Sequence, residues 1–492
     1  MLRITEITCE LQARPLAIAT QHPRFSWKLE SDEKDTIQTA YRTQVWTSEN
    51  QLIWDSGRIE HRHTYDIVYE GTVLKSAERY IYQIQVWDNH GNTATSGMQR
   101  FETAYFQTSD WKACWIEPDP LPQLPENPLP KAQEIWNECL MAMMRGEQPK
   151  YYMDGDIWDT LLTEPYDPPV RFRRIFELEE KPEYAKVFLT AHGIYSLSVN
   201  GQKVPRSLLM PGFTTYDKRL KYQAYDITDF LNAGKNALSV TVADGWYKGK
   251  IALGKGCEYG EVPGMLMQME IRNTDGTRTQ LCSDEAFTYS FDGPIQYADL
   301  FLGECVDARK DDGDPSEISY EAKNWEKVKT AKKDLYDFAV LTAQTAPEIE
   351  VYAEIPASEI LTTPKGETVV DFGQNMAGTI RVELSAKVGE EICFEHGETL
   401  DKDGSFTYAF TDTTRAQKDV YISAGRESEV FEPEFTYHGF RYVKVTGGEN
   451  WKPEQFTAKA ISSANPVIGS FQCSDKKLNQ LQHNIYWSQR SN

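Results

Sequence analysis

Residues 187–201 read Val187-Phe188-Leu189-Thr190-Ala191-His192-Gly193-Ile194-Tyr195-Ser196-Leu197-Ser198-Val199-Asn200-Gly201. The first five form a continuous run without the alternation of a half-exposed strand, which is typical of a strand buried on both faces. The last two, Asn200 and Gly201, favour the tight turn of a β-hairpin. This stretch therefore predicts buried β-structure in the middle of the chain.

Similar signals extend from this stretch toward both ends of the chain. Tyr80–Trp87 alternates with a period of two, and the turn residues Asp88–Asn92 follow it. Regular short strands separated by turn residues are typical of β-sandwiches of about 100 residues. We therefore predict an all-β multidomain fold.

The 492 residues are too many for one hydrophobic core, and their pattern divides them into four parts. We predict a β-sandwich at 1–108, a second β-domain at 109–345, a third β-sandwich at 346–465, and a linker with a helix at 466–492. An insertion at about 118–169 interrupts the second domain. It is rich in proline and then predicts a helix at about 131–145. It is interpreted either as a wall over a ligand site or as decoration.

A helical pattern begins near Ser474, the residue expected to cap it, and is still running at the last residue. Leu478, Leu481 and Ile485 follow at three- and four-residue spacing and define one apolar face. Together with Trp487, this face needs cover, which either the third domain or a second copy of the chain would supply. A homodimer is one of the two expectations.

Charge and composition exclude several classes of partner. The formal net charge of -22 argues against nucleic acid and against anionic membrane surfaces. No apolar run has membrane-spanning length, and Met1–Ile7 lacks the apolar stretch of a signal peptide. The eight cysteines are scattered without a Cys-x-x-Cys pair, which favours reduced thiols. These features predict a cytoplasmic protein.

Four strings of the second domain occur in an order typical of one protein family. They are His192–Gly201, Pro211–Leu220, Tyr225–Leu231 and Ala243–Lys250. This part of the chain resembles the N-terminal jelly-roll domain of bacterial α-L-rhamnosidases. Gly303-Glu304 and Asp307-Ala308-Arg309 match a further string of that family.

The flanking domains extend the resemblance over nearly all of the chain. Pro23–Trp27 and Trp54–Gly57 resemble the fibronectin-III-like opening module of these enzymes. Asp371–Gly378 and Phe435–Val443 resemble their concanavalin-like domain. The resemblance thus implies a fibronectin-III-like sandwich, a jelly roll, a concanavalin-like sandwich and a short C-terminal helix.

The resemblance also implies a function. The family hydrolyses terminal, non-reducing α-L-rhamnose from glycosides with inversion, and its catalytic acids lie in an (α/α)6 barrel. Phe471–Arg490 looks like the lead-in to that barrel, so we assign no catalytic residue and expect the catalytic domain to be missing. We expect a carbohydrate-binding and scaffold fragment that is inactive alone, with the catalytic domain and a rhamnose-containing carbohydrate as partners. Two alternatives stay open: an active glycoside hydrolase that uses carboxylates of the β-domains, and a purely structural β-protein.

Four residues in the jelly-roll strings have the chemistry of a sugar site: Asp217, Lys218, Trp246 and Tyr247. Charged side chains bind the hydroxyls of a pyranose, and an aromatic ring stacks on its C–H face. A tight turn at Asp244-Gly245 would push Trp246 outward. The alternative is that these are turn and core residues that fix the jelly roll.

The sequence requires no cofactor, and we predict no metal ligands. Related jelly-roll modules bind rhamnose with calcium, so the resemblance allows a calcium ion at this domain. Asp311-Asp312-Gly313-Asp314 lacks EF-hand spacing. Glu395-His396-Gly397-Glu398 offers too few ligands for a metal site.

Two further polar residues lie in the concanavalin-like strings. His438 and Arg441 could face the cleft of a partner domain, since packing alone does not require them in a turn-rich string. They could equally tie a turn to the sandwich. Both interpretations stay open.

Overall fold

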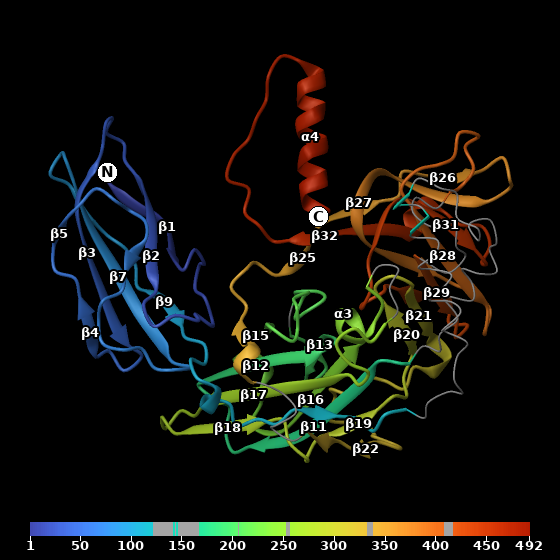
Figure 1. The fold of residues 1–492 in the computed structure, drawn as a ribbon, viewed down its shortest axis with the longest axis horizontal. Helices are drawn as coiled ribbons and strands as arrows, with labels where there is room; N and C mark the ends of the chain where they lie inside the picture. The colour runs from blue at the N-terminus through green and yellow to red at the C-terminus, as the bar shows by residue number, and fades with distance from the viewer. Residues whose placement is uncertain are drawn as a thin grey trace.

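The computed structural model describes residues 1–121, 141–142, 144–145, 167–204, 206–251, 256–331, 338–407 and 417–492. The predicted all-β class is confirmed: three β-domains follow one another, and a helix stands at the end of the chain (Figure 1). Most of the insertion predicted at about 118–169, with its helix at about 131–145, lies outside the described residues.

The first domain is a sandwich of two antiparallel sheets. One sheet contains β1 (Arg3–Cys9), β2 (Arg24–Glu30) and β6 (Ile67–Val68). The other contains β4 (Leu52–Asp55), β3 (Gln38–Thr47), β7 (Arg79–Asp88) and β8 (Thr93–Thr95), with β5 (Ile59–Glu60) and β9 (Gln99–Glu102) at its margins. The predicted period of two is visible in β7, where every second side chain is buried between the sheets.

The second domain also packs two sheets face to face. One has the order β23 (Lys329–Thr330), β10 (Ile116–Glu117), β17 (Gly264–Arg272), β12 (Tyr184–His192), β15 (Leu220–Asp226), β24 (Leu341–Ala343), and β18 (Arg278–Cys282) pairs with β17. The other has the order β14 (Gln202–Lys203), β13 (Ile194–Val199), β16 (Gly234–Ala243), β11 (Val170–Leu178), β19 (Thr288–Ser290), β22 (Glu326–Lys327).

Residues 187–201 form the buried strand and the hairpin turn that their sequence predicts. Residues 187–191 in β12 are buried on both faces. Val199 pairs with Gln202 across a two-residue turn. Asn200 and Gly201 both have positive φ, 50° and 77°, which the turn of this hairpin requires.

The third domain contains a sheet that reaches back into the second. Its order is β20 (Ile295–Asp299), β21 (Gly303–Asp307), β29 (Lys418–Ile422), β28 (Glu391–Gly397), β31 (His438–Thr446), β27 (Thr368–Leu384), β32 (Phe456–Ser463), β25 (Ile349–Pro356). Two further strands, β26 (Glu359–Thr362) and β30 (Glu429–Phe431), pair with β27. Because β21 pairs in parallel with β29, residues 295–307 join this sheet although they precede β24 of the second domain.

Short helical turns connect these strands. The 3-10 turns are η1 (Thr108–Asp110), η2 (Thr228–Phe230), η3 (Ala308–Lys310), η5 (Phe338–Val340) and η6 (Pro453–Gln455). The α-helix α3 (Gly245–Lys248) follows β16, and α4 (Lys476–Arg490) ends the chain. Within the described residues, no helix is long and apolar enough to cross a membrane.

A buried ionic contact joins the first and second domains. Lys186, near the start of β12, is fully buried, and its Nζ lies 2.9 Å from Oε2 of Glu102 at the end of β9. The same Nζ donates to the carbonyl oxygens of Leu16 and Thr103 at 3.1 and 3.4 Å. Tyr184 donates its hydroxyl proton to Glu102 Oε2 at 2.6 Å. Burial acts to raise the pKa of Glu102, but Lys186 beside it brings the net pKa below the usual value.

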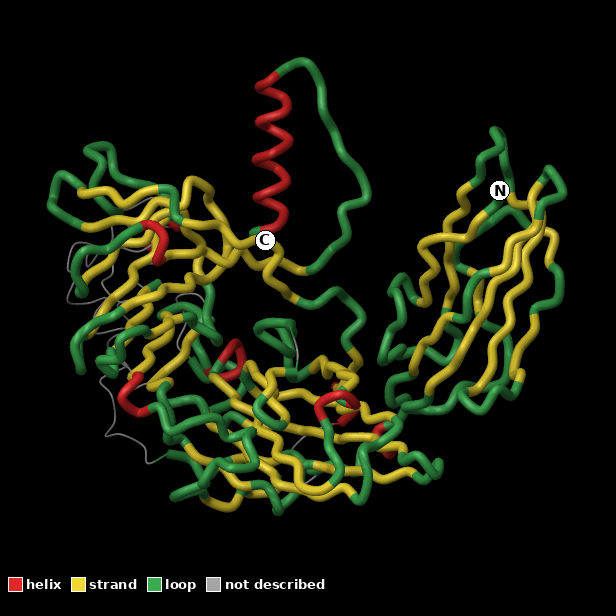
Figure 2. Tube along the Cα trace, turned by 180° about the vertical axis from the view of Figure 1, so that it is seen from behind, coloured by secondary structure: helices red, strands yellow, loops and turns green. Residues whose placement is uncertain are grey.

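Helix α4 rises away from the three domains and contacts the third through its C-terminal half, from His483 onward (Figure 2). The predicted cap at Ser474 is wrong: Asp475 caps the helix, because its carboxylate accepts hydrogen bonds from the backbone N–H groups of Lys477 and Leu478. In the last turn, Trp487 packs on Tyr352, with ring centroids 5.6 Å apart. The predicted apolar face is about half exposed at each of its three residues, Leu478, Leu481 and Ile485.

Candidate functional site

Helix α3 carries the two aromatic residues predicted to bind sugar. Tyr247 stacks on the ring of His192 at 4.4 Å between centroids, and His192 stacks on Trp115 at 3.8 Å. Trp246, on the same helix, lies 6.0 Å from Phe213, whose side chain is 50% exposed. Tyr247 therefore belongs to a packed three-ring stack, whereas Trp246 and Phe213 form an aromatic pair at the surface.

The predicted turn before Trp246 takes the form of this short helix. Asp244 adopts helical backbone angles, and Gly245 has a φ of +53°. A Cβ on Gly245 would lie 2.9 Å from the backbone nitrogen of Ile194, so this position requires glycine. Trp246, the next residue, is half-buried.

The two charged residues predicted to bind sugar lie on an exposed turn. The side chains of Asp217 and Lys218 are 60% and 79% exposed and form an ion pair of 3.5 Å with each other. Tyr216, directly before them, is buried and connects this turn to the aromatic rings. Its ring lies 6.2 Å from Phe213 and 6.0 Å from Tyr247. The structure thus places all four predicted residues on two neighbouring segments.

Glu117 is a polar residue beside this cluster that the sequence did not reveal. It lies on β10, and its Oε1 atom is buried without a hydrogen-bond partner among the described residues. Burial raises the pKa of Glu117 from its usual value of 4.5 to about 7. Its charge also adds to the rise in the pKa of Tyr247, which burial mainly causes. No motif marks Glu117, because a lone glutamate at a strand end has no sequence signature.

The acidic residues beneath α3 have structural partners. Asp299 accepts hydrogen bonds from the backbone N–H groups of Lys250, Phe301 and Leu302 at 2.7, 2.8 and 3.0 Å. Burial raises the pKa of Asp244 to about 6, although its ion-pair partner Lys248 opposes this shift. Asp299 is buried and Asp244 is mostly buried, and the contacts of both carboxylates hold α3 in place.

The two polar residues predicted in the concanavalin-like strings have different surroundings. His438 is buried at the start of β31, and its Nε2 lies 3.1 Å from Asp419 Oδ1. Arg441 forms two hydrogen bonds with Asp371, at 2.9 and 2.8 Å, which tie β31 to β27. Their role toward a partner domain stays a prediction. Asp419 was not found from the sequence, since nothing in its strand distinguishes it from a surface aspartate.

Three family models match the chain, one for each β-domain. Residues 4–107 match the Rha78A-like, N-terminal immunoglobulin domain. Residues 180–353 match the alpha-L-rhamnosidase N-terminal domain, and residues 361–462 match the bacterial alpha-L-rhamnosidase concanavalin-like domain.

Curated relatives and solved structures agree with these matches. An alpha-L-rhamnosidase of Formosa agariphila is 30% identical over 97% of this chain and 49% of its own length. One from Streptomyces avermitilis is 28% identical over 100% of this chain and 60% of its own length. The crystal structure of the Streptomyces avermitilis alpha-L-rhamnosidase complexed with L-rhamnose has a TM-score of 0.87, with 26% identity over all of this chain and 60% of that one. The Dictyoglumus thermophilum alpha-L-rhamnosidase structure has a TM-score of 0.84 at 29% identity, over 99% of this chain and 52% of that one.

The chain spans about half to three-fifths of the length of these relatives. The matched parts are the β-domains described above, in the same order along the sequence. The chain therefore belongs to the α-L-rhamnosidase family and consists of its N-terminal β-domains.

Proposed function

We propose that this chain is the non-catalytic β-scaffold of an α-L-rhamnosidase. In the full-length protein it would support a separate domain that hydrolyses terminal α-L-rhamnose from glycosides with inversion. One observation carries the proposal: the carboxylates that line a cavity between the first and second domains are all engaged with other groups of the protein. An inverting hydrolase instead needs one carboxyl group free to donate a proton and a second free to activate water.

This cavity, of about 440 Å³, lies between the first and second domains and has room for a sugar. Its three carboxylates are those of Glu78, Asp110 and Glu270. Glu78 forms an ion pair with Arg278. Asp110 accepts from Ser76 Oγ at 2.6 Å and from two backbone N–H groups.

Glu270, the third carboxylate, is equally engaged. It accepts hydrogen bonds from the Tyr105 hydroxyl group and from Gln280 Nε2, the latter at 2.9 and 3.1 Å to its two oxygens. Each acid of the cavity would have to lose its partners before it could act on a glycoside. The cavity therefore has the polar lining of a domain junction and not the free acid and base of this reaction.

An activity assay tests the scaffold proposal directly. The chain, incubated with p-nitrophenyl α-L-rhamnopyranoside, should release no p-nitrophenol above the uncatalysed rate. Turnover that disappears in Glu270→Gln or Glu78→Gln would overturn the proposal, since it would place the acids of the reaction in these β-domains.

A specific observation favours carbohydrate binding as a second candidate function. Phe213 is half exposed and packs beside the half-buried Trp246, and Asp217 and Lys218 stand on the adjoining turn. A sugar stacked on this pair would expose its rim hydroxyls to charged groups, which is the usual pattern of carbohydrate recognition. The proposed ligand is a rhamnose-containing carbohydrate.

Titration with L-rhamnose, with and without calcium, tests this second candidate. Trp246→Ala and Phe213→Ala should each reduce the binding heat to the level of buffer. Tyr65→Ala is the matched control, because Tyr65 is an exposed aromatic residue of the first domain. If the unmutated chain gives no heat under either condition, the scaffold function alone remains.

A further inference from the structure

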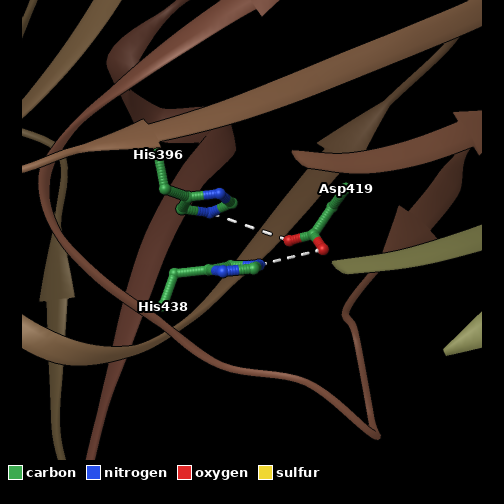
Figure 3. Close-up of side chains that lie close together, drawn as sticks. All are labelled: His396, Asp419 and His438. Carbon is green, nitrogen blue, oxygen red and sulfur yellow. Dashed lines mark hydrogen bonds and ion pairs between the residues drawn. The ribbon is translucent and has the colours of Figure 1, made fainter. Parts of the chain in front are cut away.

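Three buried side chains of the third domain converge on one point (Figure 3). His396 comes from β28, Asp419 from β29 and His438 from the start of β31. The exposed fractions of the three side chains lie between 0% and 1%. Their potential ligand atoms all lie within 4.8 Å of one another.

The hydrogen bond at the far side of the His396 ring fixes its tautomer. His396 Nδ1 lies 3.1 Å from the carbonyl oxygen of Gln417. A carbonyl only accepts, so Nδ1 carries the proton and, in the neutral ring, Nε2 presents a lone pair. A ring N–H that donates to a backbone carbonyl is the usual support of a metal-ligating histidine.

The other side of this ring faces a second acceptor. His396 Nε2 lies 3.7 Å from Asp419 Oδ2, and both atoms are buried without a hydrogen-bond partner among the described residues. Two buried acceptors that face each other are unfavourable unless something positive lies between them. A shared proton would draw them to about 2.7–3.2 Å, so the observed separation is too long for a hydrogen bond.

The second histidine completes a set of nitrogen and oxygen donors. His438 Nε2 lies 3.1 Å from Asp419 Oδ1, and the two imidazole rings stack with centroids 4.2 Å apart. Each carboxylate oxygen thus faces one imidazole (Figure 3). In a tetrahedral zinc site with bonds of about 2.0–2.1 Å, neighbouring ligand atoms are about 3.3 Å apart. The separations of 3.1 Å from His438 Nε2 to Oδ1 and 3.7 Å from His396 Nε2 to Oδ2, the other oxygen of Asp419, lie on either side of that value.

We propose that His396, Asp419 and His438 form a structural binding site for a divalent transition-metal ion, with zinc as the chemically favoured occupant. Two imidazoles and a carboxylate select zinc over calcium and magnesium, which prefer oxygen ligands alone. Coordination requires the Nδ1–H tautomer of His438, so that its Nε2 presents a lone pair.

The surroundings support a structural role for this ion. The backbone N–H of Glu304, in β21, donates to Asp419 Oδ1 at 2.9 Å. Glu304 accepts in turn from the backbone N–H groups of Glu434 and Phe435, at 3.1 and 2.8 Å, just before β31. An ion on Asp419 would therefore hold three strands of the shared sheet, β28, β29 and β31, close to the strand that comes from the second domain. Because the site is closed to solvent, the ion would enter as the domain folds.

Metal analysis of the purified chain tests the site. The reference protein is His61→Gln/His63→Gln, which removes an exposed histidine pair with rings 4.3 Å apart that could bind zinc at the surface. After denaturation with chelator and refolding with zinc, the reference protein should hold one equivalent of zinc. In His396→Gln and in His438→Gln on this background, that equivalent should be lost. Retention of the full equivalent in either variant would overturn the proposal.

Cobalt substitution avoids reliance on variants that could fail to fold. Cobalt refolded into the reference protein should give the intense visible absorption of a four-coordinate site with nitrogen and oxygen ligands. X-ray absorption should show two imidazoles per ion. Weak six-coordinate bands, or no bound cobalt in a correctly folded protein, would overturn the proposal. Removal of zinc should also lower the melting temperature of the reference protein and leave that of His396→Gln unchanged.

Discussion

The two junctions between neighbouring domains are built from different interactions. The first and second domains meet through a buried ion pair, Lys186 with Glu102, supported by Tyr184. The second and third domains share a sheet, because β20 and β21 pair with β29. The first junction thus depends on side-chain contacts, which also include the packing of Tyr105 on Phe188, whereas the second depends on backbone pairing within one sheet. Removal of one group should destabilise the first junction locally. The second junction should unfold only together with its whole sheet.

The largest expected effect is a disruption of the shared sheet at Gly303. This residue has a φ of +119°, and a Cβ on it would lie 2.2 Å from the carbonyl oxygen of Lys418. Gly303→Ala should lower the free energy of unfolding by about 4 kcal/mol, since backbone strain and overpacking each cost about 1–3 kcal/mol. Urea unfolding followed by tryptophan fluorescence measures the loss.

Gly366→Ala is the matched control for Gly303→Ala. Gly366 also has positive φ, +82°, but nothing lies within 4 Å of its added Cβ. Its substitution should cost about 1 kcal/mol from backbone strain alone. Equal losses in the two variants would contradict the close approach of β21 to β29.

The second-largest effect is expected when the cation Lys186 is removed from the junction of the first and second domains. Lys186→Met should cost about 3 kcal/mol, because Glu102 is left buried without its main partner. The loss lies at the lower end of the usual range since Arg79 Nε still donates to Glu102 at 3.0 Å. Calorimetry should show the first domain unfolding separately from the other two.

An exposed ion pair of the first domain gives the contrast to Lys186. Lys28 Nζ lies 2.5 Å from Glu6, with both side chains about two-thirds exposed. Lys28→Met should change the free energy of unfolding by less than about 1 kcal/mol.

A double variant tests whether Lys186 and Glu102 are coupled. Adding Glu102→Gln to Lys186→Met should recover part of the lost stability. If it recovers none, the two charges are not coupled.

A smaller effect is expected from removing the Tyr184 hydroxyl group at the same junction. Tyr184→Phe removes the donor that lies 2.6 Å from Glu102 Oε2. The expected loss is about 1.5 kcal/mol, as for a hydrogen bond to a charged group. Tyr65→Phe, at an exposed tyrosine, should be neutral in the same urea titration. Equal values for both would show that the Tyr184 hydroxyl adds nothing to the junction.

A pH-dependent effect is expected away from both junctions, at Glu117. Its pKa is raised by burial from 4.5 to about 7, so the folded protein keeps this proton at pH values where the unfolded chain has lost it. The stabilising contribution of Glu117 is therefore complete below pH about 4.5 and is lost as the pH rises through about 7. The melting temperature of Glu117→Gln, relative to the unmutated chain, should be higher at pH 8 than at pH 4.5. A pH-independent difference would show that this carboxyl is not desolvated, and the exposed Glu261→Gln serves as control.

Local patterns in the sequence predicted the fold class but not the junctions. The burial of Val187–Ala191 and the turn at Asn200-Gly201 follow from composition within a few residues. The parallel pairing of β21 with β29 joins segments more than a hundred residues apart, and no local pattern encodes such a pairing. The same holds for Lys186 and Glu102.

The candidate site residues also fall into two groups: those marked by a local string in the sequence and those brought together only by the fold. Trp246 and Tyr247 were found because they are adjacent in a string that resembles a known family. The convergence of His396, Asp419 and His438 was missed, since each comes from a different strand. Glu117 was missed because its raised pKa arises from burial, which a single sequence position does not reveal.

The buried pair at the first junction also sets an order of events during protein synthesis. Glu102 leaves the ribosome with the first domain, and Tyr184 follows 82 residues later, with Lys186 just behind it. At about 5–20 residues per second, the nascent chain carries this carboxylate with Arg79 but without Tyr184 and Lys186 for about 4–16 s. Until then the first domain exposes Glu102 at an unfinished surface. Translation speed across residues 103–186 thus decides how long the unpaired domain is open to proteases and wrong partners.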